Sequence, residues 1–228
     1  MLDVGCGAGE STRAAAAVAA RVVGVDISRP LIEHAQRLSR DANASYLAAD
    51  AADHPFEAAA YTVCISRFGA MFFSEPRAAF TNLSGALRPG GRLVLLVWQQ
   101  REHNEWETAV REALAPGAAP PRVDRGADAF SLGDPDEVTD VLTGAGFDDV
   151  HFDPVIEPVH YGPDVDTAYD LVMSLREPRA LVDSLSPADR DAAAQRLRTA
   201  LAQHRSADGG VQFGSRAWIV TARRPSSG

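Results

Sequence analysis

Several residue types that carry common chemistry are scarce or missing in this sequence. It contains no lysine, and all 22 basic residues are arginine, so neither a Schiff base nor a lysine general base can be built. The two cysteines, Cys6 and Cys64, are too few for a disulfide framework or a zinc site with four thiolates. No uninterrupted apolar run reaches the roughly 18 residues that a membrane-spanning helix needs. These absences favour a reducing cytoplasm as the location.

Positive charge is also in short supply. The 228 residues include 31 acidic side chains against 22 arginines, which gives a net charge of −9. Nucleic acids and anionic membrane surfaces both bind proteins through positively charged surfaces, so neither is expected as the main partner. The length is sufficient for one α/β domain with a full core.

The first half of the sequence alternates short β-branched runs with alanine-rich stretches, which is typical of a parallel sheet covered by helices. Strands are predicted at residues 2–4, 21–27, 45–48, 61–66, 92–98, 150–152 and 216–222. Helices are predicted at residues 12–20, 29–40, 76–87, 105–114 and 135–145, and residues 164–204 are also predicted to be helical. Ser11 is the expected N-cap of the first helix.

A glycine-rich segment, Asp-Val-Gly-Cys-Gly-Ala-Gly-Glu-Ser at residues 3–11, joins the first predicted strand to the first predicted helix. Glycine allows positive φ and a close approach of the backbone to a ligand, and a helix N-terminus offers free N–H groups. The dinucleotide fingerprint requires glycine or alanine where Glu10 stands, and a carboxylate there would repel a pyrophosphate. The segment therefore disfavours NAD and favours a nucleoside ligand without phosphates. Asp3 can bind a cationic amine of such a ligand.

Aspartates end the next two predicted strands. Asp26 can accept hydrogen bonds from both hydroxyls of a ribose, each contributing about 1.5–3 kcal/mol, although an ordinary strand-end aspartate is the alternative. Asp50 can accept a hydrogen bond from the exocyclic amine of adenine, and Ala51 can donate one from its backbone N–H. The alternative role of Asp50 is a helix or turn cap. Residues 66–68 lie at the carboxyl end of the fourth predicted strand, where ligands bind in open α/β sheets.

Residues 2–9, Leu-Asp-Val-Gly-Cys-Gly-Ala-Gly, resemble the cofactor motif of the class I S-adenosylmethionine-dependent methyltransferases. Asp26, Asp50 and the segment Leu-Arg-Pro-Gly-Gly at residues 87–91 match later landmarks of that family in order and spacing. Residues 66–73 and 217–223 resemble its small-molecule subgroup related to ubiquinone and menaquinone biosynthesis. Relatives carry some tens of residues before the glycine motif, so the resemblance also implies that an N-terminal segment is missing here.

The resemblance implies S-adenosyl-L-methionine as the cofactor and a doubly wound, Rossmann-like fold. The expected sheet has seven strands, mostly parallel with an antiparallel last strand, and helices on both faces. One methyltransferase domain would cover the whole chain, with residues 1–98 as its cofactor-binding half and insertions at 99–132 and 153–212 shaping the acceptor site. The implied cofactor contacts are Asp3, Gly5, Cys6, Gly7 and Gly9 for the methionine end, Asp26 for the ribose, Ile27, Asp50 and Ala51 for the adenine, and Ser66 and Phe68 near the sulfonium.

The expected partner is a small, partly apolar acceptor methylated at O, C or N. Much of the acceleration can come from holding acceptor and methyl group together, and a base is needed only if the acceptor loses a proton. His103, just past the fifth predicted strand, is the first candidate for that base, with a solvated loop histidine as the alternative; His54 and Glu105 follow. The segment Ser-Arg-Phe at residues 66–68 differs from the Asn-Pro-Pro-Tyr of amino-directed nucleic-acid methyltransferases, which argues against a nucleobase target.

Two other functions compete with this prediction. The first is a catalytically silent protein that binds the cofactor and serves as a partner of another enzyme. The second is an NAD-dependent oxidoreductase, which is disfavoured by Glu10 and by the lack of a Tyr-x-x-x-Lys pair in a chain without lysine. The histidines show no metal-ligand spacing, so no metal site is predicted.

Overall fold

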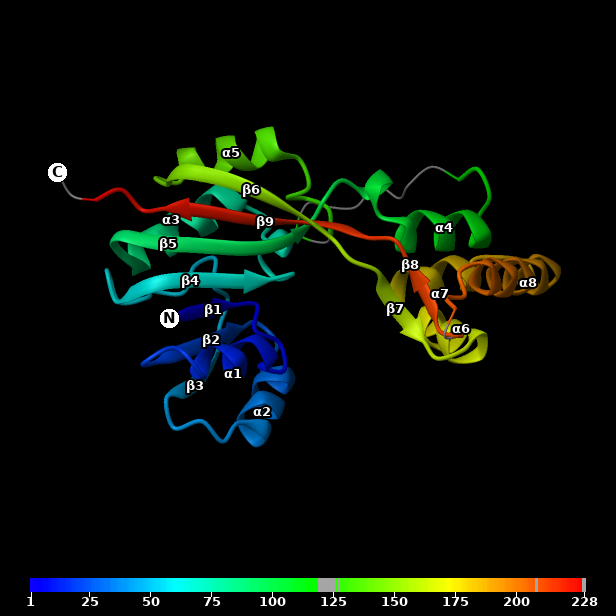
Figure 1. The fold of residues 1–228 in the computed structure, drawn as a ribbon, viewed down its shortest axis with the longest axis horizontal. Coiled ribbons are helices and arrows are strands. Elements are labelled where there is room, and N and C mark those ends of the chain that lie inside the picture. Colours follow the sequence, from blue (N-terminus) through cyan, green and yellow to red (C-terminus); the bar gives the residue numbers. More distant parts are fainter. Residues whose placement is uncertain (119–125, 127, 208, 227–228) are drawn as a thin grey trace. The chain divides into compact units, whose positions relative to one another are not determined.

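A computed structural model describes residues 1–118, 126, 128–207 and 209–226, and the chain divides into two compact units (Figure 1). The first unit comprises Met1–Gln99, Val123–Val155 and Ala217–Gly228. The second comprises Gln100–Arg122 and Ile156–Arg216. The assignment of the whole chain to one methyltransferase domain stays a prediction.

A seven-stranded sheet with the order β3-β2-β1-β4-β5-β9-β6 forms the first unit. Its strands are β1 (Leu2–Val4), β2 (Val22–Asp26), β3 (Ala44–Ala48), β4 (Tyr61–Arg67), β5 (Leu87–Trp98), β6 (Asp148–Ile156) and β9 (Arg216–Arg223). The neighbours from β3 to β5 pair in parallel, whereas β9 pairs antiparallel with β5, so that Arg92 lies opposite Arg223. This topology confirms the predicted fold class.

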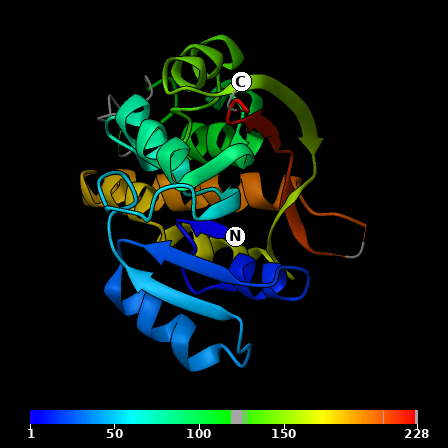
Figure 2. The same ribbon diagram turned by 90° about the vertical axis from the view of Figure 1, so that its left-hand side faces the viewer.

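Four helices among the described residues of the first unit connect or cover these strands: α1 (Glu10–Ala16), α2 (Arg29–Leu38), α3 (Pro76–Ala86) and α5 (Pro135–Gly144). A short 3₁₀ turn, η1 (Ala70–Phe72), follows β4. Through α1 and α2 the chain adds β2 and then β3 on one side of β1. Through α3 it adds β5 beyond β4, on the other side of β1. Right-handed crossovers therefore place α3 on the other face of the sheet from α1 and α2. The helices α3 and α5 pack against each other (Figure 2).

The core of the first unit lies between the sheet and the α3–α5 layer. The β5 residues Leu93, Leu95 and Val97 alternate with half-buried neighbours and are buried against Phe80 and Leu83 of α3. Burial of each such side chain contributes about 1.5–3 kcal/mol.

The second unit contains α4 (Glu105–Leu114), α6 (Val165–Ser174), α7 (Arg176–Asp183), α8 (Pro187–Gln203) and a two-stranded sheet of β7 (Val159–Gly162) and β8 (Val211–Phe213). The predicted helical segment 164–204 is therefore three helices. Leu175 has an extended backbone that ends α6, and Ser186 caps α8 by accepting the backbone N–H of Asp189. The sequence did not predict the β7–β8 pair, in which Tyr161 and Phe213 meet edge to face.

The part of the chain that the structure describes has no helix that is both long and apolar enough to span a membrane.

Candidate functional site

A cavity of about 370 Å³ lies in the first unit, at the carboxyl ends of the central strands. Six of the predicted cofactor residues line it: Gly5, Asp26, Ile27, Asp50, Ala51 and Phe68. The strand order reverses between β1 and β4, and such a switch point is where open α/β sheets bind ligands. Five other predicted residues do not line the cavity: Asp3, Cys6, Gly7, Gly9 and Ser66.

The exits of β1 and β4 approach each other through two glycines. Gly5 has φ +68, and a Cβ built on it would lie 2.8 Å from the Cα of Gly69. A Cβ on Gly69 would lie 2.9 Å from the Cα of Gly5 and 3.0 Å from the carbonyl oxygen of Val4. Backbone packs on backbone here, so neither position has room for a side chain. Gly69 was not among the predicted site residues, although its place directly after a strand exit was the available signal.

Asp26 ties the glycine turn to the end of β2. Its two oxygens accept the backbone N–H groups of Gly7 and Ser28, each at 2.8 Å. An ionised carboxylate has about four acceptor positions, so both oxygens keep capacity for a ligand hydroxyl. Asp26 also lines the cavity, and it can therefore hold a ligand and the turn at once.

Asp50 and Ala51 follow β3 at the same edge of the sheet. The Oδ1 of Asp50 accepts the backbone N–H of Ala52 at 2.9 Å, which closes a turn and leaves the other carboxylate oxygen accessible. The side-chain amide of Asn82, on α3, donates to the carbonyl oxygens of Ala51 and His54 at 3.1 and 2.9 Å. Asn82 therefore anchors the loop from behind, a role that only the folded structure reveals.

Asp3 is fully buried beneath the glycine turn. Its Oδ2 accepts the hydroxyls of Ser11 and Thr12 at 2.7 and 2.5 Å, whereas its Oδ1 has no hydrogen-bond partner among the described residues. Ser11 is thus inside α1 and bonds Asp3, and the residue preceding the helix is Gly9 with φ +79, so the predicted Ser11 cap is wrong. The unsatisfied oxygen is an acceptor that a ligand ammonium group suits.

Burial raises the pKa of Asp3, and hydrogen bonds from Thr12 and Ser11 oppose this shift. A carboxyl group whose pKa is higher in the folded state contributes stability below its unfolded pKa, and this contribution is lost as pH rises through the folded value. Asp3→Asn is neutral at every pH and removes this dependence. We expect the free energy of unfolding of the variant to increase relative to that of the wild type as pH rises above about 4, the ordinary pKa of an aspartate.

Urea denaturation at successive pH values measures that difference, with Asp53→Asn, an exposed aspartate of the same unit, as the matched control. A difference between Asp3→Asn and the wild type that stays constant with pH contradicts the prediction.

Aromatic side chains follow β4. Phe68 lines the cavity with φ +56, a left-handed conformation that costs a bulky residue on the order of 1–3 kcal/mol. Its ring stacks on Trp98, with centroids 4.2 Å apart and planes at 23°. Phe73 is buried edge-to-face against Phe80, while Phe72 is 48% exposed and also lines the cavity. The stack holds Phe68 in a strained position beside the cavity.

Ser66 plays a structural part through its side chain. Its buried hydroxyl donates to the carbonyl oxygen of Val4 at 2.7 Å and accepts the backbone N–H of Ala70 at 2.9 Å. These bonds fix the exit of β4 against β1.

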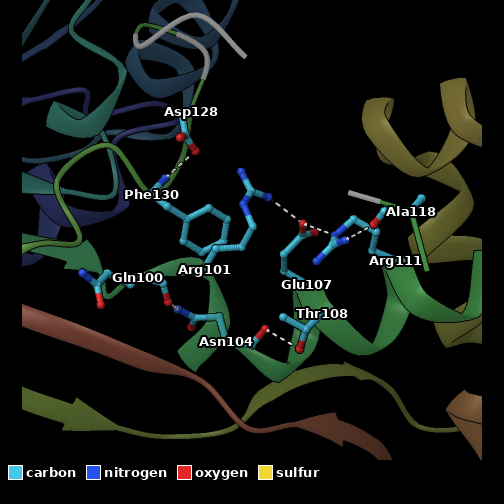
Figure 3. Close-up of polar contacts among 9 residues, drawn as sticks. All are labelled: Gln100, Arg101, Asn104, Glu107, Thr108, Arg111, Ala118, Asp128 and Phe130. Atoms are coloured by element: carbon cyan, nitrogen blue, oxygen red, sulfur yellow. Dashed lines mark hydrogen bonds and ion pairs between the residues drawn. The ribbon is translucent and has the colours of Figure 1, made fainter. Parts of the chain in front are cut away.

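His103, the predicted base, is exposed at the end of the 3₁₀ turn η2 (Arg101–His103) in the second unit. Figure 3 shows the adjoining start of α4, where the Glu107 carboxylate lies between the guanidinium groups of Arg101 and Arg111, at 2.5 and 3.3 Å. Glu105, another candidate base, accepts the backbone N–H of Gly214 at 2.8 Å.

The contacts of Glu105 weaken it as a base. The hydrogen bond from Gly214 and the contact of Nε2 of His204, at 3.0 Å, lower the pKa of Glu105.

His54, the remaining candidate base, lies in the first unit, where its ring packs edge to face on Phe56 with the ring centroids 4.8 Å apart.

A mostly parallel sheet with a glycine turn, strand-end aspartates and a cavity at its switch point defines a protein of the Rossmann-like class. Residues 2–95 match the family described as "Methyltransferase domain". The chain is 36% identical over 96 residues to a demethylmenaquinone methyltransferase of Clavibacter sepedonicus, a match that covers 42% of this chain and 39% of the relative.

Solved structures share the fold. The YcgJ protein of Bacillus subtilis superposes with a TM-score of 0.65 at 17% identity, covering 99% of this chain and 92% of that one. Phosphoethanolamine N-methyltransferase 2 of Haemonchus contortus, solved with S-adenosylhomocysteine, gives a TM-score of 0.59 at 20% identity over 100% of this chain and 48% of its own.

The match to the methyltransferase family covers residues 2–95, less than half of the chain. The chain spans about two fifths of the length of the curated relatives that it matches, between 39% and 44% for the first three.

Proposed function

We propose that this protein transfers the methyl group of S-adenosyl-L-methionine to a small, partly apolar acceptor. The observation that carries the proposal is the lining of the cavity, which combines the carboxylates Asp26 and Asp50 with the aromatic rings of Phe68 and Phe72. Carboxylates suit the hydroxyls and amine of an adenosine. Aromatic faces suit a sulfonium and an apolar acceptor, and a cation–π contact contributes about 0.5–2 kcal/mol.

The residues present fit this cofactor. Asp26 has free acceptor capacity for the ribose, and Ile27, Asp50 and Ala51 would hold the adenine. The unsatisfied Oδ1 of Asp3 suits the ammonium group of the methionine end. The proposed contacts of that end also include Gly5, Cys6, Gly7 and Gly9, with Ser66 and Phe68 bordering the sulfonium.

When bound, the cofactor supplies a methyl group that the positive sulfonium has already activated. The chain must then orient the acceptor in line with that methyl group and keep water away. Such positioning corresponds to an effective molarity of the acceptor of about 10⁵–10⁸ M. Phe68 is suited to this task because its stack on Trp98 keeps its ring in one place. His103 would take a proton from an acceptor that must lose one.

The same proposal places the protein in the cytoplasm and makes neither nucleic acid nor membrane its partner. Both cysteines are buried free thiols, and burial raises the pKa of Cys6 to about 12, which keeps this thiol protonated and unreactive. The negative net charge of −9 supports the exclusion of nucleic acid.

Transfer of a labelled methyl group from the cofactor to a panel of small metabolites tests the proposal. We expect label in a small acceptor and equimolar S-adenosylhomocysteine, and we expect no binding of NADH by calorimetry. With an acceptor that loses a proton, His103→Ala should lower kcat about 100-fold or more. His151→Ala, an exposed histidine of the first unit, is the matched control.

Cofactor binding without transfer to any metabolite of the panel would support the silent partner protein instead. An unchanged kcat in His103→Ala shows that His103 is not the base.

A further inference from the structure

A turn just before α5 reaches back to the exit of β4. Residues 128–133 form this turn, which belongs to the first unit and lies outside the segment that matches the methyltransferase family. The hydroxyl of Ser131 donates a hydrogen bond to the carbonyl oxygen of Met71, 60 residues earlier in the chain. Met71 is the middle residue of η1, the short 3₁₀ turn that follows β4.

This hydrogen bond supplies a donor that η1 itself lacks. The second helical bond of η1 runs from the N–H of Phe73 to the carbonyl oxygen of Ala70. The backbone becomes extended at Phe73, with φ −68 and ψ 123, so the helical series stops before it reaches the carbonyl oxygen of Met71. The last carbonyl groups of a helix need partners from elsewhere, and Ser131 provides one.

The turn that carries Ser131 is itself held by the first unit. Leu132 is 2% exposed and belongs to the core of that unit. The carbonyl oxygen of Gly133 accepts the indole N–H of Trp218, on β9, at 3.1 Å. The carbonyl oxygen of Asp128 accepts the backbone N–H of Ser131 at 3.2 Å. The hydroxyl of Ser131 is therefore presented to η1 from an anchored position.

A second contact lies at the end of η1. A Cβ built on Gly126, two residues before the turn, would lie 3.2 Å from the Cβ of Ser74 and 3.3 Å from its Cα. Ser74 lines the cavity proposed for the cofactor. The segment around the turn therefore touches this wall of the cavity at two places.

The aromatic residues of that wall differ in how they are held. Phe72 and Phe73 both line the cavity. Phe73 is buried edge to face against Phe80, which fixes its ring. Phe72 is 48% exposed, so burial in the core does not fix its ring, and its direction depends on the backbone of η1. A ligand in the cavity would cover the exposed part of this ring.

We propose that Ser131 is a positioning residue for this cavity. By holding the carbonyl group of Met71, it fixes the backbone of η1 and keeps the ring of Phe72 directed over the bound ligand. The inference rests on the proposed function, because it takes the cavity as the site of the cofactor. It adds to that function a residue whose side chain does not line the cavity and acts through Phe72.

A double-mutant cycle tests this assignment by calorimetry with S-adenosylhomocysteine. Ser131→Ala should weaken binding about 10-fold, the effect of one lost hydrogen bond, and Phe72→Ala should weaken it at least as much. The double variant should bind no more weakly than Phe72→Ala alone, because the ring that Ser131 positions is already absent. All three variants should fold, since Phe72 is exposed and Ser131 is only half-buried.

Two further variants distinguish positioning from a general loss of stability. Ser131→Thr keeps the hydroxyl donor and should bind S-adenosylhomocysteine as the wild type does. Thr139→Val is the matched control: it removes a half-buried hydroxyl of α5 that donates to the carbonyl oxygen of Pro135 at 2.7 Å and does not line the cavity. Its affinity should be unchanged.

Hydrogen exchange tests the link to η1 without a ligand. The amide of Phe73, which closes η1, should exchange about 10-fold faster in Ser131→Ala than in the wild type, and at the wild-type rate in Thr139→Val.

Losses of affinity that add in the double variant, or an unchanged affinity in Ser131→Ala, overturn the proposal, as does an unchanged exchange rate of the Phe73 amide. If the wild type does not bind S-adenosylhomocysteine, the proposed function fails instead. The exchange rates still decide whether Ser131 holds η1, so the two failures are distinguishable.

Discussion

Replacing Gly5 with alanine is expected to lower the free energy of unfolding by about 3 kcal/mol and to abolish measurable cofactor binding. Two costs add up. The backbone of Gly5 has φ +68, which an L-residue adopts only with strain, and its new Cβ would lie 2.8 Å from the Cα of Gly69. Because that neighbour is backbone, relief requires the exits of β1 and β4 to separate, and this separation distorts the cavity that both exits line.

Gly7→Ala is the matched control for this prediction. Gly7 also has positive φ, at +53, but a Cβ there would meet nothing within 4 Å. Its N–H, which donates to Asp26, is kept in alanine. We expect it to lose only the strain cost of about 1–2 kcal/mol. Urea denaturation and calorimetry measure both variants, and equal losses of stability in the two would show that the approach to Gly69 is unimportant.

The sheet could be predicted because its strands carry their own signals. The apolar run over 93–98 indicates a buried strand, and the helix between β4 and β5 has a helical pattern of its own. The start of β5 was predicted wrongly. Leu87 already pairs with Tyr61, and Gly90, with φ +74, lies within the strand rather than in a preceding turn. The Pro-Gly-Gly sequence at residues 89–91 indicates a turn. The pairing with β4, which makes these residues part of a strand, cannot be seen in the local sequence.

Elements that depend on distant partners could not be predicted. Residues 159–162 and 211–213 are too short to show alternation, and they become strands because they pair with each other across about 50 residues. The first helix begins at Glu10, ahead of the predicted start, and its early residues Ser11 and Thr12 bond Asp3. Local helix propensity does not contain that contact.

The candidate site was predictable where a residue lies at a strand end. Asp26 and Asp50 line the cavity because parallel strands bring their carboxyl ends to one edge, which the strand order alone implies. Gly69 and Asn82 were missed, since their parts rest on contacts with segments far along the chain. A lone glycine or asparagine in a sequence does not indicate such contacts.

Asp26→Ala is expected to lower the affinity for S-adenosylhomocysteine about 100-fold. The change removes both the proposed acceptor of the ribose hydroxyls and an anchor of the glycine turn. The backbone N–H groups of Gly7 and Ser28 each lose a bond of 2.8 Å. Asp26→Asn keeps one oxygen acceptor without the charge, so its loss should be smaller, about 10-fold. Calorimetry measures both.

Comparison of two ligands separates the ribose contact from the support of the turn. If Asp26 binds the ribose, the wild type should prefer adenosine to 2′,3′-dideoxyadenosine, and Asp26→Ala should lose most of that preference. A role limited to the turn would weaken both ligands by the same factor, because the turn is equally disturbed whichever nucleoside is bound. Full retention of the wild-type preference in Asp26→Ala therefore rules out the ribose contact, even if the overall affinity falls as expected.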